Sequence, residues 1–69
     1  MSEVIINQVQ TFRKEKGMTQ EDLAAAVEVS RQTIIAVEKG NYTPSVLLAL
    51  KIAAVFGRKV EEIFSIAYE

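Results

Sequence analysis

The sequence predicts a small all-α domain of five short helices, with a small β-ribbon formed by the two ends of the chain. Sixty-nine residues suffice for one domain, and we expect residues 1–69 to form it. A hydrophobic content of 49% argues against disorder. Apolar residues recur at helical spacing, and residues that favour helix starts and ends bracket five segments.

The first helix is expected to begin after Asn7. The Asn7 side chain is a good N-cap, and Gln10 stands three residues later, where it would complete a capping box. Gly17 is the natural end of this helix. Its inner face is predicted to carry Ile6, Val9, Phe12 and Arg13.

Only Glu28-Val29-Ser30 separates the second predicted helix from the third, without a Gly, Pro or Asn to turn the chain. Thr19 is a suitable N-cap for the second helix, and Ser30 for the third, which Gly40 ends. Because the connection is so short, the two helices are expected to cross steeply.

The fourth helix is expected to start at Thr43-Pro44, with Pro at the first helical position, and to end at Gly57. A short fifth helix should begin near Val60, and the β-prone ends "SEVII" and "SIAYE" should pair as a small antiparallel ribbon. The fourth helix is predicted to turn this stripe to the core: Val46, Ala49, Leu50, Ala53 and Phe56.

The composition excludes several kinds of chemistry. There is no Cys and no His, which removes disulfides, thiol and imidazole catalysis and the usual zinc sites. We therefore expect no enzyme, no cofactor and no metal. The longest apolar tract, about Val46 to Phe56, is interrupted by Lys51 and is too short for a membrane span. A cytoplasmic protein with no membrane partner is expected.

The charge is unevenly distributed. A net charge of −1 argues mildly against a nucleic-acid partner. All eight Lys and Arg, however, lie between Arg13 and Lys59, which together with five acidic residues gives that segment a net charge of +3. The remaining acidic residues lie towards the ends of the chain.

The segment "TQEDLAAAVEVSRQTIIAVEKGNYTPS" resembles the helix-turn-helix of the phage Cro/repressor-like (XRE-type) transcriptional regulators. The likeness covers roughly residues 9 to 64 and implies a lambda-repressor-like fold with its helix-turn-helix at about residues 19–39. It also implies a sequence-specific regulator, expected to be a repressor, that binds double-stranded DNA. The residues that carry the resemblance are Gln20, Ala24, Val29, Ser30, Arg31, Gln32, Thr33, Ile34, Val37 and Glu38.

The resemblance places the third helix in the major groove of DNA. Arg31 can bind guanine and Gln32 can bind adenine, each through two hydrogen bonds, and Ala36 would face the same groove. Ile35 has two open interpretations, contact with a thymine methyl group or packing at the edge of the core.

Contacts with the DNA backbone also follow from the resemblance, as does a structural pair, Arg13 with Glu38, that ties the first helix to the third. For Arg31 and Lys39 the alternative is a merely solvated charge. For Gln20, Thr43 and Ser45 the alternative to a DNA contact is helix capping alone. The implied backbone contacts are Thr19, Gln20, Ser30, Thr33, Lys39, Asn41, Tyr42, Thr43 and Ser45.

One residue departs from the family pattern. Glu28 stands where the family usually has Gly, at a turn position that commonly needs a positive φ. A side chain in that conformation costs on the order of 1 kcal/mol. It also brings a negative charge near the side that would face DNA.

The surplus of apolar residues predicts a homodimer, formed by residues 60–69 and the fourth helix. A symmetric pair would read two half-sites about 34 Å apart. The alternative is a monomer whose fifth helix covers its own core. A second functional interpretation is a protein-interaction module of the same fold, such as an antitoxin. The predicted dimer residues are Leu48, Ile52, Ile63, Phe64, Ile66 and Tyr68.

Overall fold

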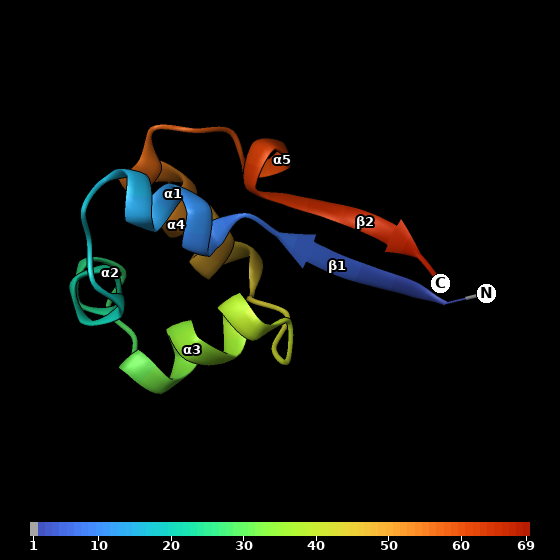
Figure 1. Cartoon of the computed structure of the whole chain (residues 1–69), viewed down its shortest axis with the longest axis horizontal. Helices are drawn as coiled ribbons and strands as arrows, with labels where there is room; N and C mark the ends of the chain where they lie inside the picture. The colour runs from blue at the N-terminus through green and yellow to red at the C-terminus, as the bar shows by residue number, and fades with distance from the viewer. Residues whose placement is uncertain (1) are drawn as a thin grey trace.

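A computed structural model describes residues 2–69 of the chain. Five helices form one body, and the two ends of the chain pair as an antiparallel ribbon that projects from it (Figure 1). The expected fold is confirmed. The elements are β1 Glu3–Asn7, α1 Val9–Glu15, α2 Gln20–Ala26, α3 Arg31–Lys39, α4 Val46–Phe56, α5 Val60–Ile63 and β2 Phe64–Tyr68.

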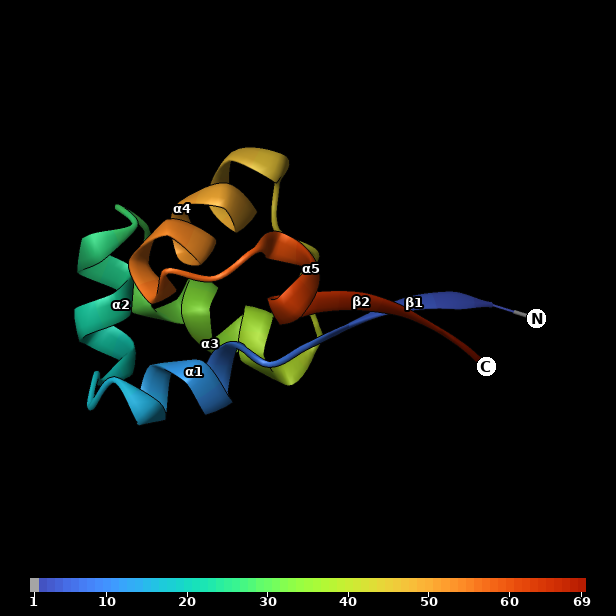
Figure 2. The same ribbon diagram turned by 90° about the horizontal axis from the view of Figure 1, so that it is seen from above.

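The ribbon is tied to the helical body at its base and projects away from it (Figure 2). At its tip, the Ser2 amide donates to the Glu69 carbonyl at 3.0 Å and the Glu69 amide to the Ser2 carbonyl at 2.9 Å. Within it, Glu3 pairs with Tyr68 and Ile5 with Ile66. At the base, the Gln8 amide donates a hydrogen bond of 2.8 Å to the Ile63 carbonyl. Over residues 2–69, no helix combines the length and the hydropathy that crossing a membrane requires.

The core lies between the five helices, and α4 supplies four of its residues, Leu48, Ile52, Ala53 and Phe56. The predicted inner stripe of α4 is therefore wrong in part, because Val46 is 77% exposed and Leu50 is 54% exposed. Hydrophobic periodicity could not choose the inner face, since Lys51 is the only charged residue in this helix.

The same rotation of α4 corrects the predicted dimer surface. Leu48 and Ile52 are buried in the core of the single chain, and so is Ile63 of α5. Phe64 is half-buried and packs on that core. Of the six predicted residues, Ile66 and Tyr68 remain as large exposed apolar side chains.

The starts of α2 and α3 follow the predicted caps. The Thr19 hydroxyl accepts a bond of 3.0 Å from the Asp22 amide, and the Asp22 carboxylate accepts one of 2.9 Å from the Thr19 amide. The Ser30 hydroxyl accepts a bond of 3.2 Å from the Thr33 amide. These reciprocal and single caps satisfy amides that the first helical turn leaves without partners.

The starts of α1 and α4 differ from prediction. Asn7 ends β1, and although its side chain accepts a bond of 3.1 Å from Val9, the N-cap position belongs to Gln8. Ser45 caps α4 by accepting a bond of 3.1 Å from the Leu48 amide. Because Ser45 supplies the capping hydroxyl, α4 begins at Val46. Pro44 therefore lies before the helix and not at its first position.

Four helices end in a residue with positive φ. Three of these residues are Gly, but at the end of α2 the residue is Glu28, with φ 62°. The Glu28 amide donates to the Ala25 carbonyl at 3.3 Å and the Val29 amide to the Ala24 carbonyl at 3.0 Å. This is the hydrogen-bond pattern of a Schellman turn, which answers how the chain turns without Gly. The positive φ expected at position 28 is confirmed.

Candidate nucleic-acid interface

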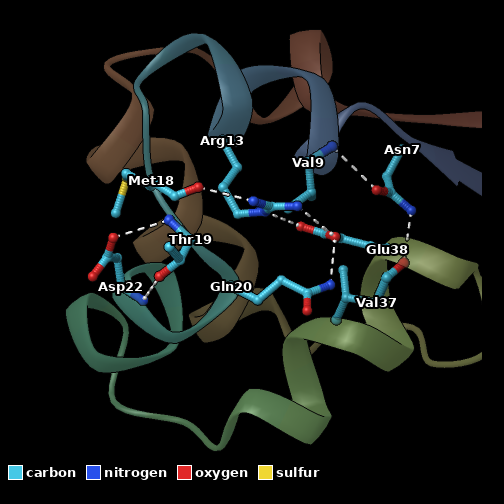
Figure 3. Close-up of polar contacts among 9 residues, drawn as sticks. All are labelled: Asn7, Val9, Arg13, Met18, Thr19, Gln20, Asp22, Val37 and Glu38. Carbon is cyan, nitrogen blue, oxygen red and sulfur yellow. Dashed lines mark hydrogen bonds and ion pairs between the residues drawn. The ribbon is translucent and has the colours of Figure 1, made fainter.

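A buried ion pair joins the first helix to the third (Figure 3). Nε of Arg13 lies 2.6 Å from Oε2 of Glu38, and Nη2 donates to Oε1 at 3.2 Å. The two side chains are only 8% and 5% exposed. This is the pair that the family resemblance predicts, and its two parallel bonds fix the rotation of α3 about its own axis.

Two further bonds extend the pair into a network. Nη1 of Arg13 donates to the Met18 carbonyl at 2.8 Å, and Nε2 of Gln20 donates to Oε1 of Glu38 at 3.1 Å (Figure 3). The network thus holds α1, the turn before α2, α2 itself and α3 in one arrangement. Gln20 braces α3 directly, and the second hydrogen of its Nε2 is not used by this bond.

Helix α3 has a buried face and an open one. Ile34 and Val37 are fully buried, whereas Arg31 and Gln32 in its first turn and Lys39 in its last are exposed. The α3 ribbon lies at the edge of the helical body rather than inside it (Figure 1). The predicted base-reading side chains therefore project from the N-terminal end of a helix whose opposite face is fixed.

Ile35 and Ala36 are partly buried on the same helix. The half-buried apolar side chains that pack on the core come from other positions, namely Phe12, Met18, Val29, Val55, Val60 and Phe64. Ile35 thus keeps a part of its surface open beside Arg31 and Gln32.

The capping hydroxyls retain a donor for phosphate. Thr19, Ser30 and Ser45 each accept a bond from a backbone amide, and this leaves the hydroxyl hydrogens of Thr19 and Ser45 free to donate. Oγ of Ser30 also lies 3.0 Å from Oγ1 of Thr33. One of these two hydroxyls donates to the other, so only one of the two hydroxyl hydrogens remains available to donate to a phosphate. Helix N-termini favour phosphate through their amides and dipole.

A groove of about 260 Å³ brings three of the predicted phosphate contacts together: Thr33, Tyr42 and Ser45. Lys51 lines the same groove and was not predicted as a site residue. It could not be inferred locally, because its partner Glu28 stands 23 positions earlier in the chain. Thr43 and Tyr42 also line a second cavity of about 250 Å³ beside the ribbon, and Lys39 and Asn41 are exposed.

The negative charge at the turn is partly balanced. Nζ of Lys51 lies 3.0 Å from Oε1 of Glu28, and both side chains are open to solvent. At the other end of α2, the hydrogen bond from the Thr19 amide holds the pKa of Asp22 below its ordinary value, and the bond with the Thr19 side chain acts in the same direction. Among residues 2–69, no three His, Cys, Asp or Glu side chains are grouped as metal ligands would be.

Comparison with known proteins gives the family. The family model described as helix-turn-helix matches residues 9–63. An uncharacterised HTH-type transcriptional regulator of Methanocaldococcus jannaschii is 57% identical over 58 residues, which cover 84% of this chain and 88% of the relative. The HTH-type transcriptional regulator YgzD of Bacillus subtilis, also uncharacterised, is 50% identical over the same shares of both chains.

A solved structure shares the fold and part of the sequence. The restriction-modification controller protein C.AhdI of Aeromonas hydrophila superposes with a TM-score of 0.75 and 29% identity, over 80% of this chain and 83% of that one. The arrangement of α2 and α3 and the exposed start of α3 indicate the same family as these relatives do. The chain belongs to the XRE/Cro-like helix-turn-helix family and is a DNA-binding, non-enzymatic transcriptional regulator.

Proposed function

We propose that this protein is a repressor that binds a palindromic operator as a homodimer and places α3 of each copy in the major groove. The observation that carries the proposal is the division of α3 into two faces. Ile34, Val37 and the Glu38 side chain are buried, while Arg31 and Gln32 are exposed at the N-terminal end. A recognition helix needs this combination of a fixed back and a free polar tip.

Base reading is assigned to the first turns of α3. Arg31 offers two parallel donors that match O6 and N7 of guanine, and the amide of Gln32 matches N6 and N7 of adenine. Ile35 and Ala36 follow one turn later and offer methyl groups to thymine. The two polar residues therefore set specificity at adjacent base pairs, and the two apolar ones add preference beside them.

Phosphate contacts would position this helix. The free hydroxyl hydrogens at the helix starts, the second Nε2 hydrogen of Gln20 and the groove of Thr33, Tyr42 and Ser45 supply neutral donors. Lys39, Asn41 and Thr43 extend the same set beyond α3. Such contacts carry affinity with little sequence information. These neutral donors would also allow a chain of net charge −1 to bind the negatively charged DNA backbone at this face.

The homodimer follows from the size of the reading surface. Helix α3 is nine residues long, and its exposed N-terminal end reaches only a few base pairs. Two copies about a two-fold axis read two half-sites one helical turn apart, which makes the operator palindromic. We place this activity in the cytoplasm, and a repressor is the simplest role for a protein that occupies its operator.

The test is a selection of bound duplexes from a random library by the purified protein, followed by fluorescence anisotropy with the enriched sequence. We expect an enriched palindrome whose half-site centres lie about 34 Å apart and whose binding weakens steeply with salt. Enrichment of an asymmetric sequence, or of none, would contradict the proposal. Loss of transcription from a promoter carrying the palindrome would establish repression, and a gain would overturn that part.

A further inference from the structure

Helix α4 has a second apolar face that points away from the core. Val46 and Leu50 are exposed on it, and Ala49 is half-buried between them. This face was predicted to lie in the core, and nothing in the described chain covers it. An amphipathic helix would carry polar residues there, so α4 is apolar on two sides.

The ribbon carries a matching apolar face. Ile5 pairs directly with Ile66, and Tyr68 follows two residues later, so the three side chains share one side of the ribbon. All three are exposed. A two-stranded ribbon is marginally stable by itself, and this one projects from the body in both views (Figures 1 and 2).

A groove joins these two faces into one surface. Its volume is about 130 Å³, and Ile5 and Phe64 of the ribbon line it together with Val46 and Ala49 of α4. We call the continuous patch the ribbon–α4 surface. It consists of Ile5, Val46, Ala49, Leu50, Ile66 and Tyr68.

We propose that the ribbon–α4 surface binds the same surface of a second copy of this chain across a two-fold axis. The proposal rests on the homodimer of the proposed function and names its contact. In an isologous contact each patch meets itself, so charges near the axis would face like charges. The six residues of the surface carry no charge, which fits self-association. Glu3, the charged residue on this side of the ribbon, pairs with Tyr68 near the tip of the ribbon.

The extent of the surface also suits a second copy. A stable interface covers roughly 800 Å² on each partner, which is about a sixth of the 4564 Å² that this chain exposes. The ribbon–α4 surface follows both five-residue strands and continues over the first two turns of α4. Patches of this kind on small proteins mark interaction sites.

The ribbon is attached directly to the recognition helix. Nδ2 of Asn7, the last residue of β1, donates a bond of 2.9 Å to the Val37 carbonyl of α3 (Figure 3). The Gln8 amide ties the same segment to Ile63. Packing of two ribbons would therefore fix the relative position of the two α3 helices, which is the quantity that half-site spacing requires.

Two matched pairs of variants test the surface. Val46→Asp is compared with Leu47→Asp, because both residues lie in the first turn of α4, where Asp favours the helix, but on different faces. Ile66→Asp is compared with Ile6→Asp, because these residues are 54% and 48% exposed on opposite sides of the ribbon. Circular dichroism confirms that each variant is folded.

Sedimentation at micromolar concentration gives the readout. We expect a wild-type dimer, at least tenfold weaker dimerisation for Val46→Asp and Ile66→Asp, and little change for Leu47→Asp and Ile6→Asp. If Ile66→Asp does not fold, Val46→Asp decides, since Val46 supports no core contact that Asp would break. Dissociation by the control variants, or a wild-type monomer at these concentrations, would overturn the proposal and leave the surface to a different protein partner.

A binding measurement separates this proposal from the proposed function. On a duplex that carries a single half-site, Val46→Asp should bind as the wild type does, whereas on the full palindrome it should lose tenfold or more. A wild-type dimer without any sequence preference would contradict the proposed function and leave the surface intact. A variant that is monomeric in sedimentation and yet binds the palindrome as tightly as the wild type would show that this surface does not set the spacing.

Discussion

The helix-turn-helix region and the ribbon region of this protein differ in what their side chains contact. In the first, Arg13, Gln20 and Glu38 share directional bonds, and each helix start has its own cap. In the second, the ribbon and the outer face of α4 expose apolar side chains with no partner in the described chain. The difference teaches that polar contacts within the chain fix where α3 lies. The exposed apolar surface, by contrast, is available for contact with a second chain.

The largest effect is expected in the buried network. Arg13→Ala leaves the Glu38 carboxylate buried without its counter-ion, which typically costs about 3–5 kcal/mol. That is a large part of the stability of a domain of this size. The free energy of unfolding, measured with urea, should fall accordingly, and the variant should be largely unfolded at moderate temperature.

The control is the exposed pair. Lys51→Ala removes the partner of Glu28 and should cost less than about 1 kcal/mol, since such pairs are screened by solvent. The double change Arg13→Met with Glu38→Leu should cost clearly less than the two single changes together. Equal costs for Arg13→Ala and Lys51→Ala would show that the buried network contributes no more to stability than an exposed ion pair does.

The turn between α2 and α3 offers a smaller, opposite effect. Glu28 has a φ of 62°, and an L-residue in this region costs about 1–2 kcal/mol that Gly does not. Gly regains about 0.4–1 kcal/mol of freedom in the unfolded chain. Glu28→Gly should therefore stabilise the fold by up to about 1 kcal/mol, less the small contribution of the Lys51 pair.

The measurement is the urea midpoint of Glu28→Gly in the wild-type background and in the Lys51→Ala background. In the second background the ion pair is already absent, so the gain should be larger. A lower midpoint in both backgrounds would show that Glu28 is unstrained, and the equivalence of this turn with the Gly turns after α1, α3 and α4 would be lost.

The smallest effect compares two caps through their acid titration. Hydrogen bonds from the Thr19 amide to Asp22, and from the Lys59 amide to Glu62, lower the pKa values of both carboxyl groups. The unfolded chain then binds more protons in acid. Their contribution to stability is complete above about pH 5 and is lost as the pH falls through the folded-state pKa values.

Urea midpoints between pH 7 and pH 3 check this prediction. Asp22→Asn and Glu62→Gln should each reduce the loss of stability on acidification, whereas Glu21→Gln should not, because Glu21 lies in the same first turn as Asp22 but outside the capping box. An unchanged pH dependence in Asp22→Asn would mean that the cap contributes nothing through its charge.

Polar signals in the sequence predicted the helix-turn-helix region well, because they act over short distances. Thr19 and Ser30 reach amides three residues away, so local spacing is sufficient to find them. The positive φ of Glu28 was expected from the family resemblance, because the family usually has Gly at this position. The Arg13–Glu38 pair spans 25 positions, and only the family resemblance could indicate it.

Apolar signals misplaced the inner face of α4. The eleven residues from Val46 to Phe56 contain one charged side chain, so several faces fit the helical period equally well. The choice depends on which side meets α1 and α5, and that is a long-range property. The same ambiguity assigned Leu48 and Ile52 to a dimer contact when the single chain buries them. Ile63 of α5, also assigned to that contact, is buried as well.

The most direct test of the central claim measures how Arg31 reads DNA. Dissociation constants are determined for the selected palindrome and for duplexes in which each base pair is replaced symmetrically, with wild-type protein and with Arg31→Ala. The wild type should lose about 1–3 kcal/mol at one base pair of each half-site, and Arg31→Ala should be indifferent there while it keeps the other preferences and its stability. Gln32→Ala serves as the matched control, with its loss at the neighbouring pair. An Arg31→Ala protein that retains every preference of the wild type would contradict the assignment of α3 to the major groove.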